Sequence, residues 1–263
     1  MSKIGLQNLK RFEVGVEEGV ALVTITHPPV NAQDHVLRVE LVRVFDILGE
    51  TDAVRSIVFT GAGTVFSAGA DLSERNALEG APGGYARHNR LVRSMLDSLA
   101  ECPKPVIAAM NGAAVGGGAV LALLCDILIV AEESFLAMTE IDHGMSGGVR
   151  HLIRSFGASD ARLAIFTGER ITGLELLRMN VASACVPRTQ LLDYAREIAA
   201  TIARKPPLAV EAAKRSFGLT EDMTLRDGYR YEQSQTASLA RTEDTREAAL
   251  ARAEKRNPKF NGR

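Results

Sequence analysis

The sequence predicts an α/β fold that ends in an all-helical region. Short apolar runs bounded by glycine or proline, which are typical of buried strands, alternate with amphipathic helical patterns up to about residue 190. Beyond that point the patterns are helical only. The composition, with 46% hydrophobic and 24% charged residues, is that of a folded globular protein. We therefore expect an α/β core over residues 1–195 and a helical C-terminal region over residues 196–263.

The first elements are a hairpin and a helix. Two apolar runs, residues 12–16 and 20–25, flank the turn formed by residues 17–19 and are typical of paired strands. An apolar stripe then predicts a helix over residues 36–48, with Gly49 directly after its last turn.

The middle of the chain alternates strands with helices. Residues 56–60 form a buried-strand pattern, and the polar, glycine-rich residues 73–84 predict a mobile loop. Apolar spacing over residues 91–99 predicts a helix, which the prolines after residue 102 end. A strand over residues 106–110 then leads to three glycines that open an apolar helix running to Cys125.

Two further strands and a set of helices complete the chain. The strands are predicted over residues 127–130 and 135–141. Thr172 and Glu175 have the spacing of a capping box, which marks a helix start. The remaining helical segments are residues 191–204, residues 207–220 and the charged stretch 224–256.

Charge and cysteine content exclude several classes of protein. The balance of 31 Lys and Arg against 32 Asp and Glu gives no general attraction to nucleic acid or anionic lipid. Three widely spaced cysteines form neither a disulfide framework nor a Cys-x-x-Cys motif. The N-terminus lacks the apolar core of a signal peptide, and the longest apolar run, residues 113–130, contains three glycines and Asp126. We therefore expect a cytoplasmic protein with no nucleic-acid partner and no membrane partner.

Two glycine-rich segments carry the strongest functional signal. They are F-S-A-G-A-D-L at 66–72 and N-G-A-A-V-G-G-G at 111–118, and each follows a predicted strand. Small residues allow the backbone to approach a ligand, and a helix N-terminus offers free N–H groups to a developing negative charge. A tight turn or close helix–sheet packing explains the same residues equally simply. Neither segment has the spacing of a dinucleotide or Walker phosphate loop.

In combination, these segments resemble the crotonase (enoyl-CoA hydratase/isomerase) superfamily over nearly the whole chain. The matching stretches are F-S-A-G-A-D-L at 66–72, K-P-V-I-A-A-M-N-G-A-A-V-G-G-G at 104–118, C-D-I at 125–127, T-E-I-D-H-G at 139–144 and T-G-E-R-I-T at 167–172. The resemblance implies an α/β spiral of ββα units with a helical C-terminal trimerisation region. It also implies an acyl-CoA substrate and a homotrimer or homohexamer.

The resemblance also assigns roles to residues. The backbone N–H groups of Ala70 and Gly117 would form an oxyanion hole for the thioester carbonyl, and Glu140 would be the general acid/base. A second catalytic glutamate of the hydratases falls at Val120 here, which departs from the family pattern. On an extended backbone Asp142 would face the same side as Glu140, so it is a candidate accessory carboxylate.

A single carboxylate suits double-bond isomerisation best, because one group can carry a proton between two carbons of an enolate. Hydration of an enoyl-CoA is the close alternative. Other acyl-CoA reactions of the family (hydrolysis, decarboxylation, ring cleavage) and a non-catalytic CoA-binding scaffold remain open.

Contacts to coenzyme A are also implied by the resemblance. They fall at Ala32, Ser67, Ala68, Ala70, Leu72 and Phe260. The position where the family often has a lysine is Ser73, so the candidates for phosphate contacts are Arg75, Lys255, Arg256 and Lys259. We expect no metal site and no separate cofactor, since coenzyme A is part of the substrate.

One rival motif is present. Residues 144–148 satisfy G-x-S-x-G, the nucleophile elbow of α/β-hydrolases. That elbow follows an apolar strand and needs Asp and His later in the chain. Here T-E-I-D-H precedes it, and the one later histidine is His151. The context therefore argues against a serine hydrolase.

Overall fold

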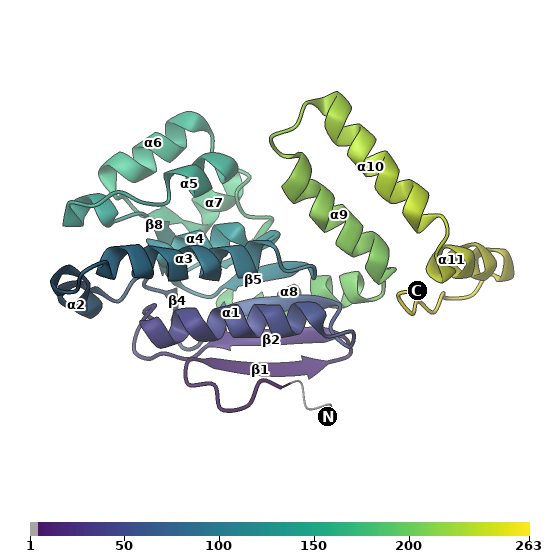
Figure 1. Ribbon diagram of the computed structural model, residues 1–263, viewed down its shortest axis with the longest axis horizontal. Helices are drawn as coiled ribbons and strands as arrows, with labels where there is room; N and C mark the ends of the chain where they lie inside the picture. Colours follow the sequence, from purple (N-terminus) through teal and green to yellow (C-terminus); the bar gives the residue numbers. More distant parts are fainter. Residues whose placement is uncertain (1–4) are drawn as a thin grey trace.

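The computed structural model describes residues 5–263, with the side chains of residues 75–77 outside that description. Two sheets and their covering helices form an α/β core, and helices alone complete the chain (Figure 1). The larger sheet has the order β1-β2-β3-β5-β7-β10 and the smaller one β4-β6-β8-β9. The strands are β1 (Phe12–Glu17), β2 (Val20–Ile25), β3 (Ser56–Gly61), β4 (Val65–Ser67), β5 (Val106–Met110), β6 (Ala113–Val115), β7 (Ile127–Ala131), β8 (Phe135–Ala137), β9 (Ile171–Thr172) and β10 (Ala184–Val186).

The helices cover the core and then form the C-terminal part. In the core they are α1 (His35–Glu50), η1 (Leu72–Glu74), α2 (Arg75–Gly80), α3 (Gly84–Ala100), α4 (Gly117–Leu124), η2 (Glu140–His143), α5 (Val149–Ser155), α6 (Ala158–Thr167) and α7 (Gly173–Arg178). They continue as α8 (Arg188–Ala203), α9 (Pro207–Thr220), α10 (Leu225–Leu239) and α11 (Glu243–Glu254). Within residues 5–263, none of the helices has both the length and the apolar composition needed to cross a bilayer.

The core repeats one unit. Strands β3, β5 and β7 of the larger sheet are each followed by a short strand of the smaller sheet, namely β4, β6 and β8, and then by helices. Neighbouring strands within β2-β3-β5-β7 and within β4-β6-β8 are parallel. The chain therefore passes from one sheet to the other in every turn, which confirms the expected spiral of ββα units.

Both faces of the larger sheet are buried, as its continuous apolar strands predict. On one face Phe45, Phe59 and Phe66 pack edge to face, with neighbouring ring centroids 5.5 Å apart. On the other face α8 packs its apolar side, including Leu191 and Ala199, against the sheet. This rigid body positions the ends of the smaller sheet, where the candidate site lies.

The C-terminal helices are joined to the core through α9. The ammonium group of Lys214 donates to Asp126 over 2.7 Å and to the Lys104 carbonyl over 3.0 Å, while Lys104 itself pairs with Glu211. From there α10 and α11 extend away from α2 and β4 (Figure 1). The division at residue 195 stays a prediction, and α8 runs through that position with its buried face on both sides.

Three expectations about local structure are wrong. Gly49 lies inside α1, where a Cβ would stand 2.9 Å from Pro103, so it permits close packing instead of ending the helix. The expected loop over residues 73–84 forms η1, α2 and the start of α3. The expected strand over residues 135–141 ends at Ala137, and η2 follows. The hairpin, the capping box and the helices after Pro206 are confirmed.

Candidate active site

The candidate site begins where strands β4 and β6 end side by side. These strands are parallel neighbours in the smaller sheet, so the loops that follow them emerge at the same edge. Ser67 is fully buried between them, and its hydroxyl donates to the Asn31 carbonyl and accepts from the Gly69 N–H. A Cβ at Gly118 would overlap the Ser67 carbonyl. The two loops are therefore in direct backbone contact.

Gly69 brings the loops to this distance. Its φ of +81° lies in the left-handed region, and a Cβ there would stand 2.5 Å from the Val115 carbonyl oxygen and 3.0 Å from the Gly117 nitrogen. Glycine tolerates the positive φ and also leaves room for the two close backbone contacts. As a result the peptide that follows Gly69 lies beside the first turn of α4.

Two backbone N–H groups remain free at this point. The backbone of Gln33 runs parallel to Ala70 and forms an isolated β-bridge with it. The Gln33 N–H donates to the Gly69 carbonyl over 2.7 Å, and the Gln33 carbonyl accepts from the Asp71 N–H over 3.3 Å. The N–H of Ala70 itself takes no part in this bridge. Gly117 is the first residue of α4, so its N–H has no helical partner. Neither of these N–H groups donates a hydrogen bond to any residue in the described part of the chain. They are the two donors predicted from the sequence.

Glu140 lies against the same glycine loop. Its Oε1 is 2.8 Å from the position that a Cβ of Gly116 would occupy, and its Cγ is 3.7 Å from the corresponding position at Gly147. The side chain is half-buried, and Oε2 is buried without a hydrogen-bond partner in the described residues. Burial raises the pKa of the Glu140 carboxyl, against smaller opposing effects of a backbone N–H and His143. An unpaired carboxyl with a raised pKa is suited to proton transfer.

Val120 is a buried apolar residue near the glycine that follows Gly147. It lies one turn into α4, is 5% exposed, and has its Cγ2 3.3 Å from the Cβ position of Gly148. The Met138 methyl group lies at the same Cβ position of Gly148. Because Glu140 and Val120 contact the consecutive residues Gly147 and Gly148, they line adjacent parts of one site.

Asp142 lies elsewhere, which removes the argument for pairing it with Glu140. Both residues belong to the 3-10 helix η2 and not to an extended strand, so residues two apart no longer share a side. The Asp142 carboxylate lies 3.0 Å from the Cβ position of Gly168, at the end of α6. The sequence pattern suggested a strand because the apolar run continues through Met138 before the turn.

The expectation that Ser67 contacts coenzyme A through its side chain is wrong, because Ser67 is fully buried and its hydroxyl is hydrogen-bonded to Asn31 and Gly69. The other residues expected to contact coenzyme A divide into two groups. Ala32 and Ala68 are half-buried and Leu72 is 58% exposed, and all three belong to the segments joined at the Gln33 bridge. Phe260 precedes Asn261, whose backbone N–H donates to Asp244 in the first turn of α11, and Figure 1 shows the C-terminus between α9 and α11, away from β4. Within one chain, Phe260 is therefore not brought to the site.

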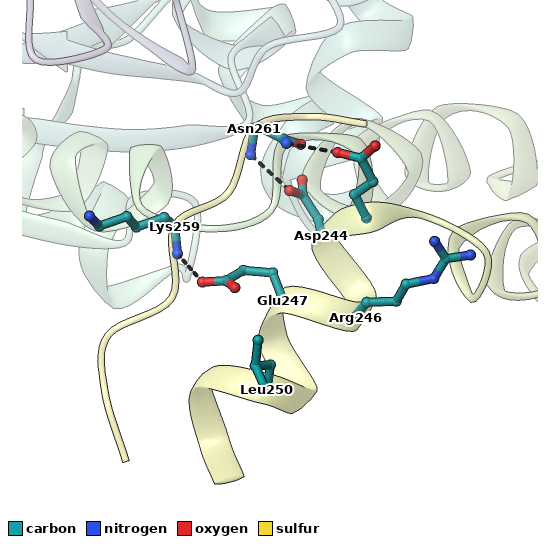
Figure 2. Close-up of a pocket in the computed structure, with 7 residues that line it drawn as sticks. Asp244, Arg246, Glu247, Leu250, Lys259 and Asn261 are labelled. Atoms are coloured by element: carbon teal, nitrogen blue, oxygen red, sulfur yellow. Dashed lines mark hydrogen bonds between the residues drawn. The ribbon is translucent and has the colours of Figure 1, made fainter. Parts of the chain in front are cut away.

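The basic residues expected at the coenzyme A phosphates lie near an acidic pocket. This pocket, of about 350 Å³, is lined by α11 and by the C-terminal segment, and Figure 2 shows Glu247 and Asp244 accepting backbone N–H groups from Lys259 and Asn261. Arg256 pairs with Glu247 and with Glu254. The pocket is lined by the carboxylates of Glu243, Asp244 and Glu247 as well as by Arg246 and Lys259, so its lining is not predominantly basic, as a phosphate site would require. The side chain of Arg75 lies outside the described residues.

The serine-hydrolase alternative has no support in the fold. Ser146 follows the 3-10 helix η2, whereas a nucleophile elbow follows a strand.

Two positions of the site were missed from the sequence. Gln33 is 3% exposed, with its Oε1 2.7 Å from the Cβ position of Gly117, and Arg38 is 1% exposed on α1. A polar residue at an otherwise apolar helix position was the one available signal for Arg38.

The fold and these donors define a protein of the crotonase class, and comparisons with known proteins give the family. The family model for enoyl-CoA hydratase/isomerase matches residues 15–263. The 2,3-dehydroadipyl-CoA hydratase of Escherichia coli K12 is 34% identical over 254 residues, which cover 95% of this chain and 98% of that protein. Carnitinyl-CoA dehydratase of Salmonella arizonae is 36% identical over 255 residues, covering 91% of this chain and 94% of that protein.

A solved structure agrees with these relatives. The crystal structure of enoyl-CoA hydratase from Bacillus anthracis matches with a TM-score of 0.91 and 32% sequence identity, covering 97% of this chain and all of that one. The chain belongs to the enoyl-CoA hydratase/isomerase family.

The raised pKa of the Glu140 carboxyl predicts how the thermal stability of the protein depends on pH. A carboxyl whose pKa is higher in the folded than in the unfolded state binds more protons when folded, so stability falls as pH rises through that interval. Glu140→Gln removes this loss, and we expect it to raise the melting temperature at pH 8 but not at pH 4. Thermal unfolding at both pH values checks this, with the exposed Glu17→Gln as control. A Glu140→Gln protein less stable than its parent at pH 8 would contradict it.

Proposed function

We propose that the protein converts an enoyl-CoA thioester through an enolate, with Glu140 as the one general acid/base. The N–H groups of Ala70 and Gly117 receive the thioester oxygen, and their position next to the start of α4 favours negative charge there. The observation that carries the proposal is a half-buried Glu140 carboxyl, with its Oε2 unpartnered within the described residues, near two free backbone donors. The named relatives, which act on CoA thioesters, support this substrate class.

Double-bond isomerisation is the reaction that these residues suit best. The Glu140 carboxylate takes a proton from Cα of a 3-enoyl-CoA, and the electron pair moves onto the thioester oxygen. The protonated Glu140 then returns the proton at Cγ, which leaves a 2-enoyl-CoA. No water takes part, and the apolar side chain of Val120 favours excluding it. The reaction needs no metal and no separate cofactor, because coenzyme A belongs to the substrate.

Hydration is the second candidate, and the names of the relatives favour it. Two of them are a hydratase and a dehydratase at 34% and 36% identity. Mass spectrometry on a panel of CoA thioesters separates the two reactions, since hydration changes the mass and isomerisation does not. The same panel reveals hydrolysis, decarboxylation or ring cleavage.

We also propose that the protein is located in the cytoplasm, on the basis of the composition of the chain.

Removing the titrating group should stop proton transfer. We expect Glu140→Gln to lower kcat by about two to four decades, the usual contribution of a positioned acid/base, with little change in affinity for a CoA thioester. In the parent, kcat/KM should fall with decreasing pH at a higher pH than for an ordinary glutamate, since the pKa of Glu140 is raised. Steady-state kinetics and calorimetry measure these quantities.

The exposed Glu133→Gln is the matched control for this experiment. Near-full turnover by Glu140→Gln would eliminate Glu140 as the acid/base. Binding without turnover by the parent as well would indicate a non-catalytic scaffold.

Position 120 tests which reaction the site performs. We expect Val120→Glu to raise the ratio of hydration to isomerisation on crotonyl-CoA, because a second carboxylate near Glu140 can share a water molecule with it. The new carboxyl is buried, so lower stability is also expected. The control, Val120→Met, changes size without adding an acceptor and should not raise hydration. Efficient hydration by the parent would show that the single-carboxylate argument is wrong.

We also propose that the protein is a homotrimer or homohexamer. Large apolar side chains on and near α9 and α10 are exposed in the single chain, including Phe217 at 77% and Leu225 at 91%. Contact with other subunits would bury them. Light scattering at micromolar concentration should give the mass of three or six chains. A stable monomer under these conditions would contradict the proposal.

A further inference from the structure

The segment after Ala70 lacks the usual means of being held in place. Residues 71–83 form η1, α2 and the turn before α3, and none of their described side chains is buried. Leu72, the large apolar residue nearest to Ala70, is 58% exposed. Among the described side chains of this segment, burial of apolar surface is therefore partial, and polar contacts help to set its position.

One carboxylate joins this segment to α1. Glu74, at the end of η1, accepts the His35 N–H over 2.6 Å and a guanidinium N–H of Arg38 over 2.7 Å. Both donors belong to the first turns of α1. Two residues earlier in the chain, Gln33 makes the backbone bridge that encloses Ala70. The start of α1 is therefore joined both to the oxyanion donor and to the segment after it.

Arg38 gives this contact its strength. Its side chain is 2% exposed, against 25% for Glu74, and the hydrogen bond to Glu74 is the one that its guanidinium makes within the described residues. Its Nε is buried without a partner. Guanidinium groups stay charged, so moving Glu74 away would leave a buried cation with no counterion. This cost favours the position of η1 seen in the structure.

His88 on α3 does not compete for Glu74. Burial lowers the pKa of its imidazole, and the charge of Arg38 acts in the same direction while Glu74 opposes both. The imidazole is therefore neutral near pH 7, and Arg38 is the cation that Glu74 pairs with.

We propose that Arg38 is a positioning residue. Its ion pair with Glu74 fixes residues 71–80 to α1 and so holds the Ala70 N–H at the angle needed to receive the substrate oxygen. The effect on turnover rests on the function proposed above, whereas the fixing of the segment does not.

Hydrogen exchange tests the fixing without any substrate. In Arg38→Met and in Glu74→Gln we expect amide exchange over residues 71–80 to accelerate by about tenfold or more, as expected when a local anchor is lost. The double variant should exchange no faster than either single variant, because both remove the same interaction. Arg38→Lys keeps the charge and should restore most of the protection.

The matched control is Arg11→Met. Arg11 also pairs with a carboxylate at the start of α1, Asp34, over 2.7 Å, and its guanidinium makes no hydrogen bond or ion pair with the described side chains of residues 71–80. We expect it to leave exchange over residues 71–80 unchanged. If Arg38→Met fails to fold, Glu74→Gln still decides the matter, since Glu74 is partly exposed.

Kinetics on the same proteins tests the second step. We expect kcat on an enoyl-CoA to fall by about ten- to a hundredfold in both single variants and in the double variant alike, with partial recovery in Arg38→Lys. Unchanged exchange over residues 71–80, or additive effects in the double variant, would overturn the proposal. Faster exchange together with an inactive parent would overturn the proposed function and leave the ion pair's role in place.

Discussion

The site depends on the close approach of two backbones, at Gly69 and at the start of α4. Gly69 packs against the Val115 carbonyl and the Gly117 nitrogen, at distances that a Cβ would not allow. This contact puts two unpaired N–H groups from distant parts of the sequence next to each other. Such donors can stabilise an oxyanion only if they are fixed before the substrate arrives, because reorientation would consume the energy they supply. The two sheets provide that rigidity.

Buried polar groups at the end of β4 maintain this contact by hydrogen bonds. Ser67 is bonded to Asn31 and Gly69, and the Asn31 side-chain amide donates to the carbonyls of Val65 and Phe66. Each of these hydrogen bonds engages a backbone carbonyl or N–H of β4 or of the loops next to it. The polar residues near the site are thus mostly structural, and the groups left for chemistry are few.

Glu140 is the exception to this pattern of satisfied groups. Its Oε2 is buried and unpaired, which costs stability and raises the pKa of the carboxyl. A conventional ion pair would remove that cost but would also hold the carboxyl ionised and less basic. The structure instead places the Glu140 side chain against Gly116 and Gly147, which supply no counterion. Local instability and reactivity therefore have the same origin.

The sequence by itself determined most of the long strands and helices, because periodicity and turn residues act locally, and it pointed to Ala70, Gly117 and Glu140 through their motifs. It did not show the short strands β4 and β6 of the second sheet, or α2 where a loop was expected. It did not determine that η2 is a 3-10 helix, which separates Asp142 from Glu140, since the turn depends on packing against Gly147 and α6. Nor did it reveal the pairing of Arg38 with Glu74 across 36 positions of the chain. Contacts between distant residues form only when the sheets have brought their helices together, so tertiary structure alone decided them.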